Sequence, residues 1–139
     1  MKKTMTNLMI AAAFVAAAAN VASAQTLKAN IPFAFRAGDK VMAPGSYHIT
    51  VRIQRNVVTL NNDEAGESAL VMAGPATDPA KSWSASGSAV LAFECAGSRC
   101  SLAQIYTGGA QSTTIPHPRL SGGEQATLRV IPLEKVNGD

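Results

Sequence analysis

The 139-residue chain has two cysteines, Cys95 and Cys100, which lie on either side of a short turn between two apolar runs. Ser88–Cys95 and Cys100–Tyr106 both have the composition of strands, and the four residues between the cysteines suit a hairpin turn. Cross-strand neighbours at such a turn have Cβ atoms about 4.5–5.5 Å apart, close to the spacing that a disulfide requires. We therefore predict a structural disulfide between Cys95 and Cys100.

A redox-active or metal-binding pair is the alternative for these cysteines. Thiol–disulfide oxidoreductases use C-x-x-C, whereas this chain has C-x4-C. A structural zinc site needs four ligands, and the sequence has no further cysteine to help complete one. The spacing therefore favours the structural bond, and we expect no metal and no cofactor.

The first 24 residues indicate the compartment in which this bond would form. Lys2 and Lys3 precede an apolar run, Leu8–Ala19, and Ala22-Ser23-Ala24 has the A-x-A form of a cleavage site. This pattern is typical of a secretory signal peptide, and the run is shorter than the ~20 residues that cross a bilayer. We predict cleavage between Ala24 and Gln25, which leaves residues 25–139 as a single domain in the periplasm or the extracellular medium. Both are compartments in which disulfides persist.

Charge and hydropathy exclude two classes of partner for this domain. The net charge of +3 includes the two lysines of the leader, so ten basic and nine acidic residues remain after it is removed. A nearly neutral chain lacks the basic surface of a nucleic-acid-binding protein. We expect no membrane span after cleavage, because no second apolar run approaches the necessary length.

Two histidines are the remaining candidates for acid–base chemistry. His48 falls on the polar face of an alternating segment, and His117 lies between two prolines. A catalytic or metal-binding histidine needs converging partners, and Glu94 or Asp78 could meet one of them. The chain has no G-x-S-x-G, H-E-x-x-H or EF-hand pattern. We therefore predict surface histidines, no catalytic residue and no enzymatic activity.

Two further patterns have a chemical and a structural interpretation. Asp63, Glu64 and Glu67 could bind a calcium ion, but a short acidic turn is more often solvated. Leu120–Gln125 looks like the signature motif of ABC-type ATPases, which acts only beside a phosphate-binding P-loop. The sequence contains no P-loop, so we interpret this motif as a glycine turn.

Trp83 is the aromatic residue with the best claim to a ligand-binding surface. It lies in Gly74–Ser86, a segment with little periodicity that we expect to be a surface loop. The indole either caps a ligand pocket or fills the open end of the core.

Alternation of apolar and polar residues predicts an antiparallel β fold. The clearest strand runs from Ser46 to Gln54, where Tyr47, Ile49, Val51 and Ile53 share one face. Further strands are expected at Val41–Met42, Val57–Asn61 and Ser68–Ala73. Ile31–Phe35 is expected to be the first strand, and Pro32 should place it at a sheet edge or introduce a bulge, because proline lacks an N–H donor.

The cysteine hairpin and the C-terminus complete the prediction. If Cys95 faces Cys100, then Phe93 faces Leu102, while Ala92/Ala103 and Val90/Ile105 pair on the other face, so the hairpin should be central and covered on both sides. Thr107–Gly123 should be a loop. Ala126–Ile131 favours a strand, although Ser121–Glu124 has the form of a helix capping box.

The run Ile31-Pro32-Phe33-Ala34-Phe35-Arg36-Ala37-Gly38, followed by Pro44-Gly45-Ser46-Tyr47, resembles a group of short, uncharacterised exported proteins of soil bacteria. Their mature region opens with I-P-F-x-F-x-x-G, and a later hairpin of theirs looks like Leu91–Tyr106. In this chain Ala43-Pro44-Gly45 replaces the group's P-A-G order, and cysteines stand beside the hairpin turn. The resemblance implies an exported β-rich domain and no site residue.

These observations predict an all-β domain, a small antiparallel sandwich or open barrel of about seven strands. We expect a non-enzymatic role, as a structural or protein-interaction component of the envelope or secretome, with the edge strand around Pro32 pairing with another exported protein. The alternative is a ligand-binding β-barrel module with a pocket near Trp83. The oligomeric state is left open.

Overall fold

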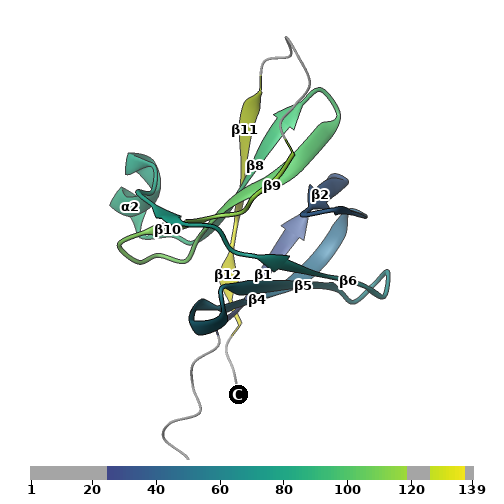
Figure 1. The fold of residues 1–139 in the computed structure, drawn as a ribbon, viewed down its shortest axis with the longest axis horizontal. Helices are drawn as coiled ribbons and strands as arrows, with labels where there is room; N and C mark the ends of the chain where they lie inside the picture. Colours follow the sequence, from purple (N-terminus) through teal and green to yellow (C-terminus); the bar gives the residue numbers. More distant parts are fainter. Residues whose placement is uncertain (1–24, 119–125, 137–139) are drawn as a thin grey trace, which may run out of the picture.

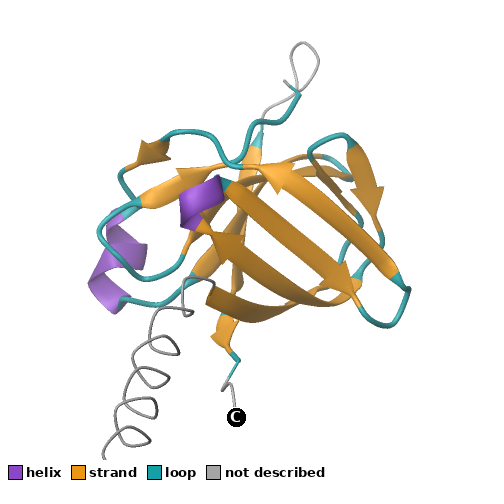
Figure 2. Cartoon of the chain, turned by 60° about the horizontal axis from the view of Figure 1, so that its bottom comes forward, coloured by secondary structure: helices purple, strands orange, loops and turns teal. Residues whose placement is uncertain are grey.

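The computed structural model describes residues 25–118 and 126–136, and in it two β-sheets pack face to face (Figures 1 and 2). The first sheet has the order β12-β1-β4-β5-β6. Its strands are β1 (Gln25–Ile31), β4 (Gly45–Arg52), β5 (Val57–Asn62), β6 (Glu67–Met72) and β12 (Glu134–Lys135).

The second sheet has the order β11-β8-β9-β10-β7, with β2 paired to β9 and β3 paired to β2. Its strands are β2 (Phe35–Ala37), β3 (Lys40–Met42), β7 (Ala76–Thr77), β8 (Val90–Ala96), β9 (Arg99–Tyr106), β10 (Ser112–Thr114) and β11 (Thr127–Pro132). The predicted all-β sandwich is therefore confirmed. The described residues form more strands than the expected seven or so, because several strands are only two or three residues long.

Strand β4 follows its predicted pattern over most of its length. Tyr47, Ile49 and Val51 are buried, and the alternate side chains face outward. The strand ends at Arg52 rather than Gln54, because the 3₁₀-helix η1 (Ile53–Arg55) and Asn56, with a φ of 51°, turn the chain into β5.

The prediction of a first strand at Ile31–Phe35 was wrong. Strand β1 comes earlier, buries Leu27, Ala29 and Ile31, and pairs with β4 along its whole length. Pro32 lies between β1 and β2, where the chain passes from one sheet to the other. Its missing N–H donor therefore marks a crossover and not an outer strand.

The cysteine hairpin is central, as predicted, because β8 lies between β11 and β9. Its turn is shorter than expected: the ladder continues to the Ala96/Arg99 pair, so Gly97 and Ser98 alone form the turn. Gly97 has a φ of +61°, which two-residue hairpin turns require.

The register of this hairpin shifts near its middle. Cys95 faces Cys100 and Phe93 faces Leu102, as predicted. Beyond them a bulge lies between Ala92 and Phe93, so Ala92 faces Gln104, Leu91 faces Ile105 and Val90 faces Tyr106. The predicted Ala92/Ala103 and Val90/Ile105 pairs were wrong because Ala103 is the extra residue, and its carbonyl accepts a hydrogen bond from Ile115 N–H.

The core between the sheets is organised around edge-to-face aromatic contacts. Phe35 lies 5.3 Å from Tyr47 of the first sheet and 5.2 Å from Phe93 of the second, measured between ring centroids. Phe33, between β1 and β2, contacts Phe93 at 5.1 Å. The I-P-F-x-F run therefore contributes two rings that join the sheets.

The C-terminal segment belongs to both sheets. Strand β11 confirms the strand predicted at Ala126–Ile131, while Ser121–Glu124, with the capping-box pattern, lies outside the described residues. After β11, Leu133 is buried and its N–H donates to Ala89 O, and β12 then pairs with β1. The segment thus closes one side of the sandwich.

Two segments expected to be loops contain short regular elements. Gly74–Ser86 includes β7 and a helix, α2 (Lys81–Ser86), and Thr107–Gly123 includes β10. Strand β10 pairs with both β9 and β7, and these pairings extend the second sheet. Among the described residues, no helix has the length and apolar character needed to cross a membrane.

Candidate functional site

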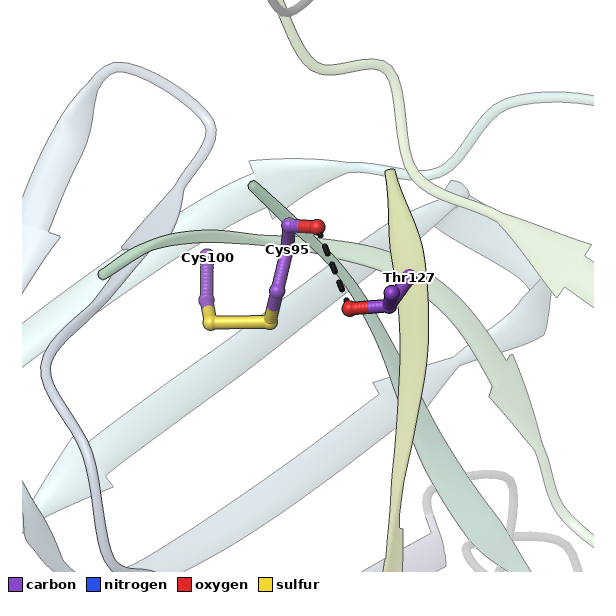
Figure 3. Close-up of a disulfide and its surroundings, with 3 residues drawn as sticks. All are labelled: Cys95, Cys100 and Thr127. Atoms are coloured by element: carbon purple, nitrogen blue, oxygen red, sulfur yellow. Dashed lines mark hydrogen bonds between the residues drawn. A yellow bond between two sulfur atoms is a disulfide. The ribbon is translucent and has the colours of Figure 1, made fainter. Parts of the chain in front are cut away.

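The disulfide lies on the core side of the second sheet. Cys95 and Cys100 are bonded across the β8–β9 hairpin with Cα atoms 4.1 Å apart, and both side chains are buried (Figure 3). Thr127 of β11 donates from Oγ1 to the Cys95 carbonyl at 3.3 Å. The bond therefore joins the hairpin end beside β11, and its burial fits the predicted structural role.

Trp83 is buried on the opposite, outer face of the second sheet. It lies in α2, which ends at Gly87 with a φ of 67° and a hydrogen bond from Gly87 N–H to Trp83 O. The indole forms a small cluster with Tyr106, Val90 and Ala92, and its ring centroid is 6.2 Å from that of Tyr106. Trp83 therefore neither fills the core between the sheets nor presents its ring to solvent.

His117 meets Glu94, one of the two carboxylates considered for it. Its Nε2 lies 3.0 Å from Glu94 Oε2, and its Nδ1 lies 3.1 Å from the Pro118 carbonyl oxygen. Both ring nitrogens therefore face oxygen acceptors. A neutral imidazole carries only one N–H donor, so both contacts can be hydrogen bonds at the same time only when the ring is an imidazolium. The two contacts hold the segment after β10 against the sheet.

The acidic turn between β5 and β6 is fixed by its own neighbours. Asn62 Oδ1 accepts hydrogen bonds from the N–H groups of Glu64 and Ala65, and Asp63 Oδ2 lies 2.7 Å from His48 Nδ1. Within residues 25–118 and 126–136, no group of three or more His, Cys, Asp or Glu side chains is placed to hold a metal ion.

Tyr47 anchors the same end of the first sheet. Its hydroxyl donates to the Ala43 carbonyl, and the ring is fully buried. Burial raises the pKa of Tyr47 above 10.0, the nearby Asn62 amide opposes this rise, and the charge of Glu67 adds to it. The buried Tyr47 side chain thus ties strand β4 to the segment that precedes it.

The predicted cleavage site lies at the limit of the described structure. Ala24 is outside it, and Gln25 is the first residue of β1.

No family model, no curated protein and no solved structure matches this chain. The surface itself must therefore indicate what the domain contacts.

Two end strands expose apolar pairs on their outer faces: β6 exposes Leu70 and Met72, and β11 exposes Leu128 and Val130. Thr127 and Arg129 pair with Cys95 and Phe93 on the core side, whereas Leu128 and Val130 pair with Glu94 and Ala92 on the outer side. Leu128 is 56% exposed and Val130 is 41% exposed. On the core side Ile131 pairs with Leu91 and packs, partly buried, against the core, so β11 carries apolar side chains on both faces. The sequence predicted this strand but not the exposure of Leu128 and Val130, because alternation alone does not show which face meets the core.

The core-facing side of β11 is closed by a cation–π contact. The guanidinium carbon of Arg129 lies 5.3 Å from the centroid of the Phe33 ring. Arg129 therefore covers Phe33 at the rim of the core, while Leu128 and Val130 lie on the opposite face of the strand.

The other long edge strand, β6, is protected. Lys40 of β3 donates from Nζ to the Ser68 carbonyl at 2.8 Å, and Glu67 Oε2 accepts from Ala43 N–H at 3.3 Å. Gly38 approaches Val71 so closely that a Cβ at position 38 would lie 3.1 Å from Val71 Cγ1. The β2–β3 turn thus covers the open side of β6, while β7 and β12 are only two residues long.

Proposed function

We propose that this protein is an exported, non-enzymatic interaction domain that uses β11 to recruit an extended strand of a partner. The observation that carries the proposal is that β11, an end strand of its sheet, exposes the apolar pair Leu128 and Val130. Natural sheets protect their edges with lysine, proline, bulges, short strands or a covering segment, and β6, β7 and β12 have such protection. Among the described residues, no strand pairs with β11 on the side away from β8.

Partner pairing at β11 would satisfy two needs at once. The backbone groups on the open side of β11 would gain ladder hydrogen bonds, and the partner's outer-face side chains would cover Leu128 and Val130. The free edge replaces the segment around Pro32, which we expected to be the partner-binding edge and which instead forms the connection from β1 to β2.

Export through the N-terminal leader is part of the same proposal. The A-x-A pattern before Gln25 and the buried disulfide both fit a domain that matures in an oxidising compartment. The alternative of a ligand pocket at Trp83 has less support, because the indole is already packed against Tyr106.

Site-specific photo-crosslinking in cells that export the protein tests the interaction role. A photoreactive amino acid at position 128 should yield a discrete adduct with another polypeptide. The matched control is position 70, because Leu70 is also an exposed leucine, on the outer face of the protected strand β6. Equal labelling at positions 70 and 128, or no adduct at either, would contradict the proposal.

A further inference from the structure

The side chains of β11 allow a definite choice of partner. We propose that β11 of one copy pairs antiparallel with β11 of a second copy, about a two-fold axis at Leu128 that is normal to the sheet. This inference rests on the proposed role of β11 as a strand-recruiting edge. It joins the second sheets of two sandwiches into one continuous sheet.

The symmetry restricts the register. A two-fold axis normal to the sheet keeps the outer faces of both copies on the same side, so opposed residues share a face. An axis at Arg129 would place two guanidinium groups opposite one another, and like charges in directly opposed positions are destabilising. An axis at Val130 would bring Pro132, which has no N–H donor, into the ladder.

An axis at Leu128 avoids both problems. Leu128 then faces Leu128, Thr127 faces Arg129 and Ala126 faces Val130. The apolar side chains that each copy exposes on its outer face cover one another, and each Arg129 has the Thr127 hydroxyl of the other copy as its neighbour. With ten basic and nine acidic residues after the leader, two processed copies carry little net charge to oppose association.

Cysteine cross-linking of the processed protein, purified from cells that express the full chain, tests this register. Leu128→Cys should form a disulfide-linked dimer under mild oxidation, because residue 128 faces itself across the axis. Arg129→Cys should form much less dimer, because residue 129 faces residue 127. Leu70→Cys, at a more exposed leucine on β6, should remain monomeric.

Sedimentation across a concentration series supplies the second readout. The unmodified protein should show a reversible monomer–dimer equilibrium, and Leu128→Lys should raise the dimer dissociation constant at least about tenfold. Leu70→Lys should leave that constant unchanged. Circular dichroism should show that both variants stay folded, since both leucines are exposed.

Three results would overturn the inference: a purely monomeric protein, dimers linked preferentially through position 129, or equal weakening by Leu70→Lys and Leu128→Lys. A monomeric protein that still gives a photo-adduct with a different polypeptide at position 128 would overturn self-pairing and leave the recruiting role of β11 standing. Loss of both signals would overturn both.

Discussion

His117 Nε2 and Glu94 Oε2 lie 3.0 Å apart, so the segment that follows β10 is held against the outer face of β8. Glu94 also stands opposite Leu128 of β11, so this contact borders the proposed interaction edge. It is the better shielded of the two histidine–carboxylate pairs: the side chains are 19% and 37% exposed, against 38% and 69% for His48 and Asp63.

Glu94→Gln should lower the free energy of unfolding by about 1 kcal/mol, because a partly shielded, charge-assisted contact is lost. Asp63→Asn is the matched control and should cost less than about 0.5 kcal/mol, since solvent screens the His48 pair more strongly. Urea denaturation measures both. A larger loss for Asp63→Asn than for Glu94→Gln would show that shielding does not rank these contacts.

Removing the Cys95–Cys100 bond should destabilise the domain modestly. The closed loop is short, with a sequence separation of 5, so the loss of loop-closure entropy amounts to about 2 kcal/mol. The double variant Cys95→Ala/Cys100→Ala should therefore fold and denature at lower urea. Intact mass of the exported protein without reductant should be two hydrogens below that of the reduced chain, and two free thiols would refute the bond.

Tyr47 should make the stability depend on alkaline pH. Burial raises its pKa above 10.0, so the fold favours the neutral phenol. Its contribution to stability is fully present below pH 10.0, the ordinary pKa of tyrosine in an unfolded chain, and is lost as the pH rises through the folded pKa. Tyr47→Phe should lose this alkaline decline and cost about 1 kcal/mol at neutral pH, because the hydrogen bond to Ala43 O disappears. Urea denaturation at several pH values measures both effects, and an unchanged alkaline decline in Tyr47→Phe would contradict the assignment.

Trp83→Ala should act on stability, because the indole packs in the cluster under α2. A loss of about 3 kcal/mol is expected for an aromatic side chain removed from such a cluster. Trp83→Phe should recover most of it, since a ring would again lie against Tyr106. Thermal or urea denaturation provides the measurement. A stable Trp83→Ala variant that had lost the binding of a metabolite or glycan would favour the pocket alternative.

The sequence was most informative where side chains alternate and a pair fixes the register. Tyr47, Ile49 and Val51 identified β4, and the two cysteines fixed the hairpin end at Cys95/Cys100. The central position of the hairpin followed from its two apolar faces.

Other features depend on contacts between distant segments. Taken alone, Pro32 suggests an edge strand, but in the structure it lies where the chain passes from one sheet to the other. A local sequence pattern does not distinguish an edge strand from such a crossover. The bulge at Ala103 accompanies a hydrogen bond from Ile115, outside the hairpin. The orientation of β11 is set by its pairing with β8. The exposure of Leu128 and Val130 could therefore be predicted only if the register between these two strands were known.

The most direct test of the central claim is hydrogen–deuterium exchange of β11 in the protein isolated with its native associations, compared with the same protein diluted alone. The alternate amides of residues 127–131 that do not bond to β8 should exchange more slowly in the associated form, because a second strand would bond to them. The amides of β6 should be unaffected by the association. Unchanged exchange in β11, or new protection confined to β6, would contradict the assignment of β11 as the recruiting edge.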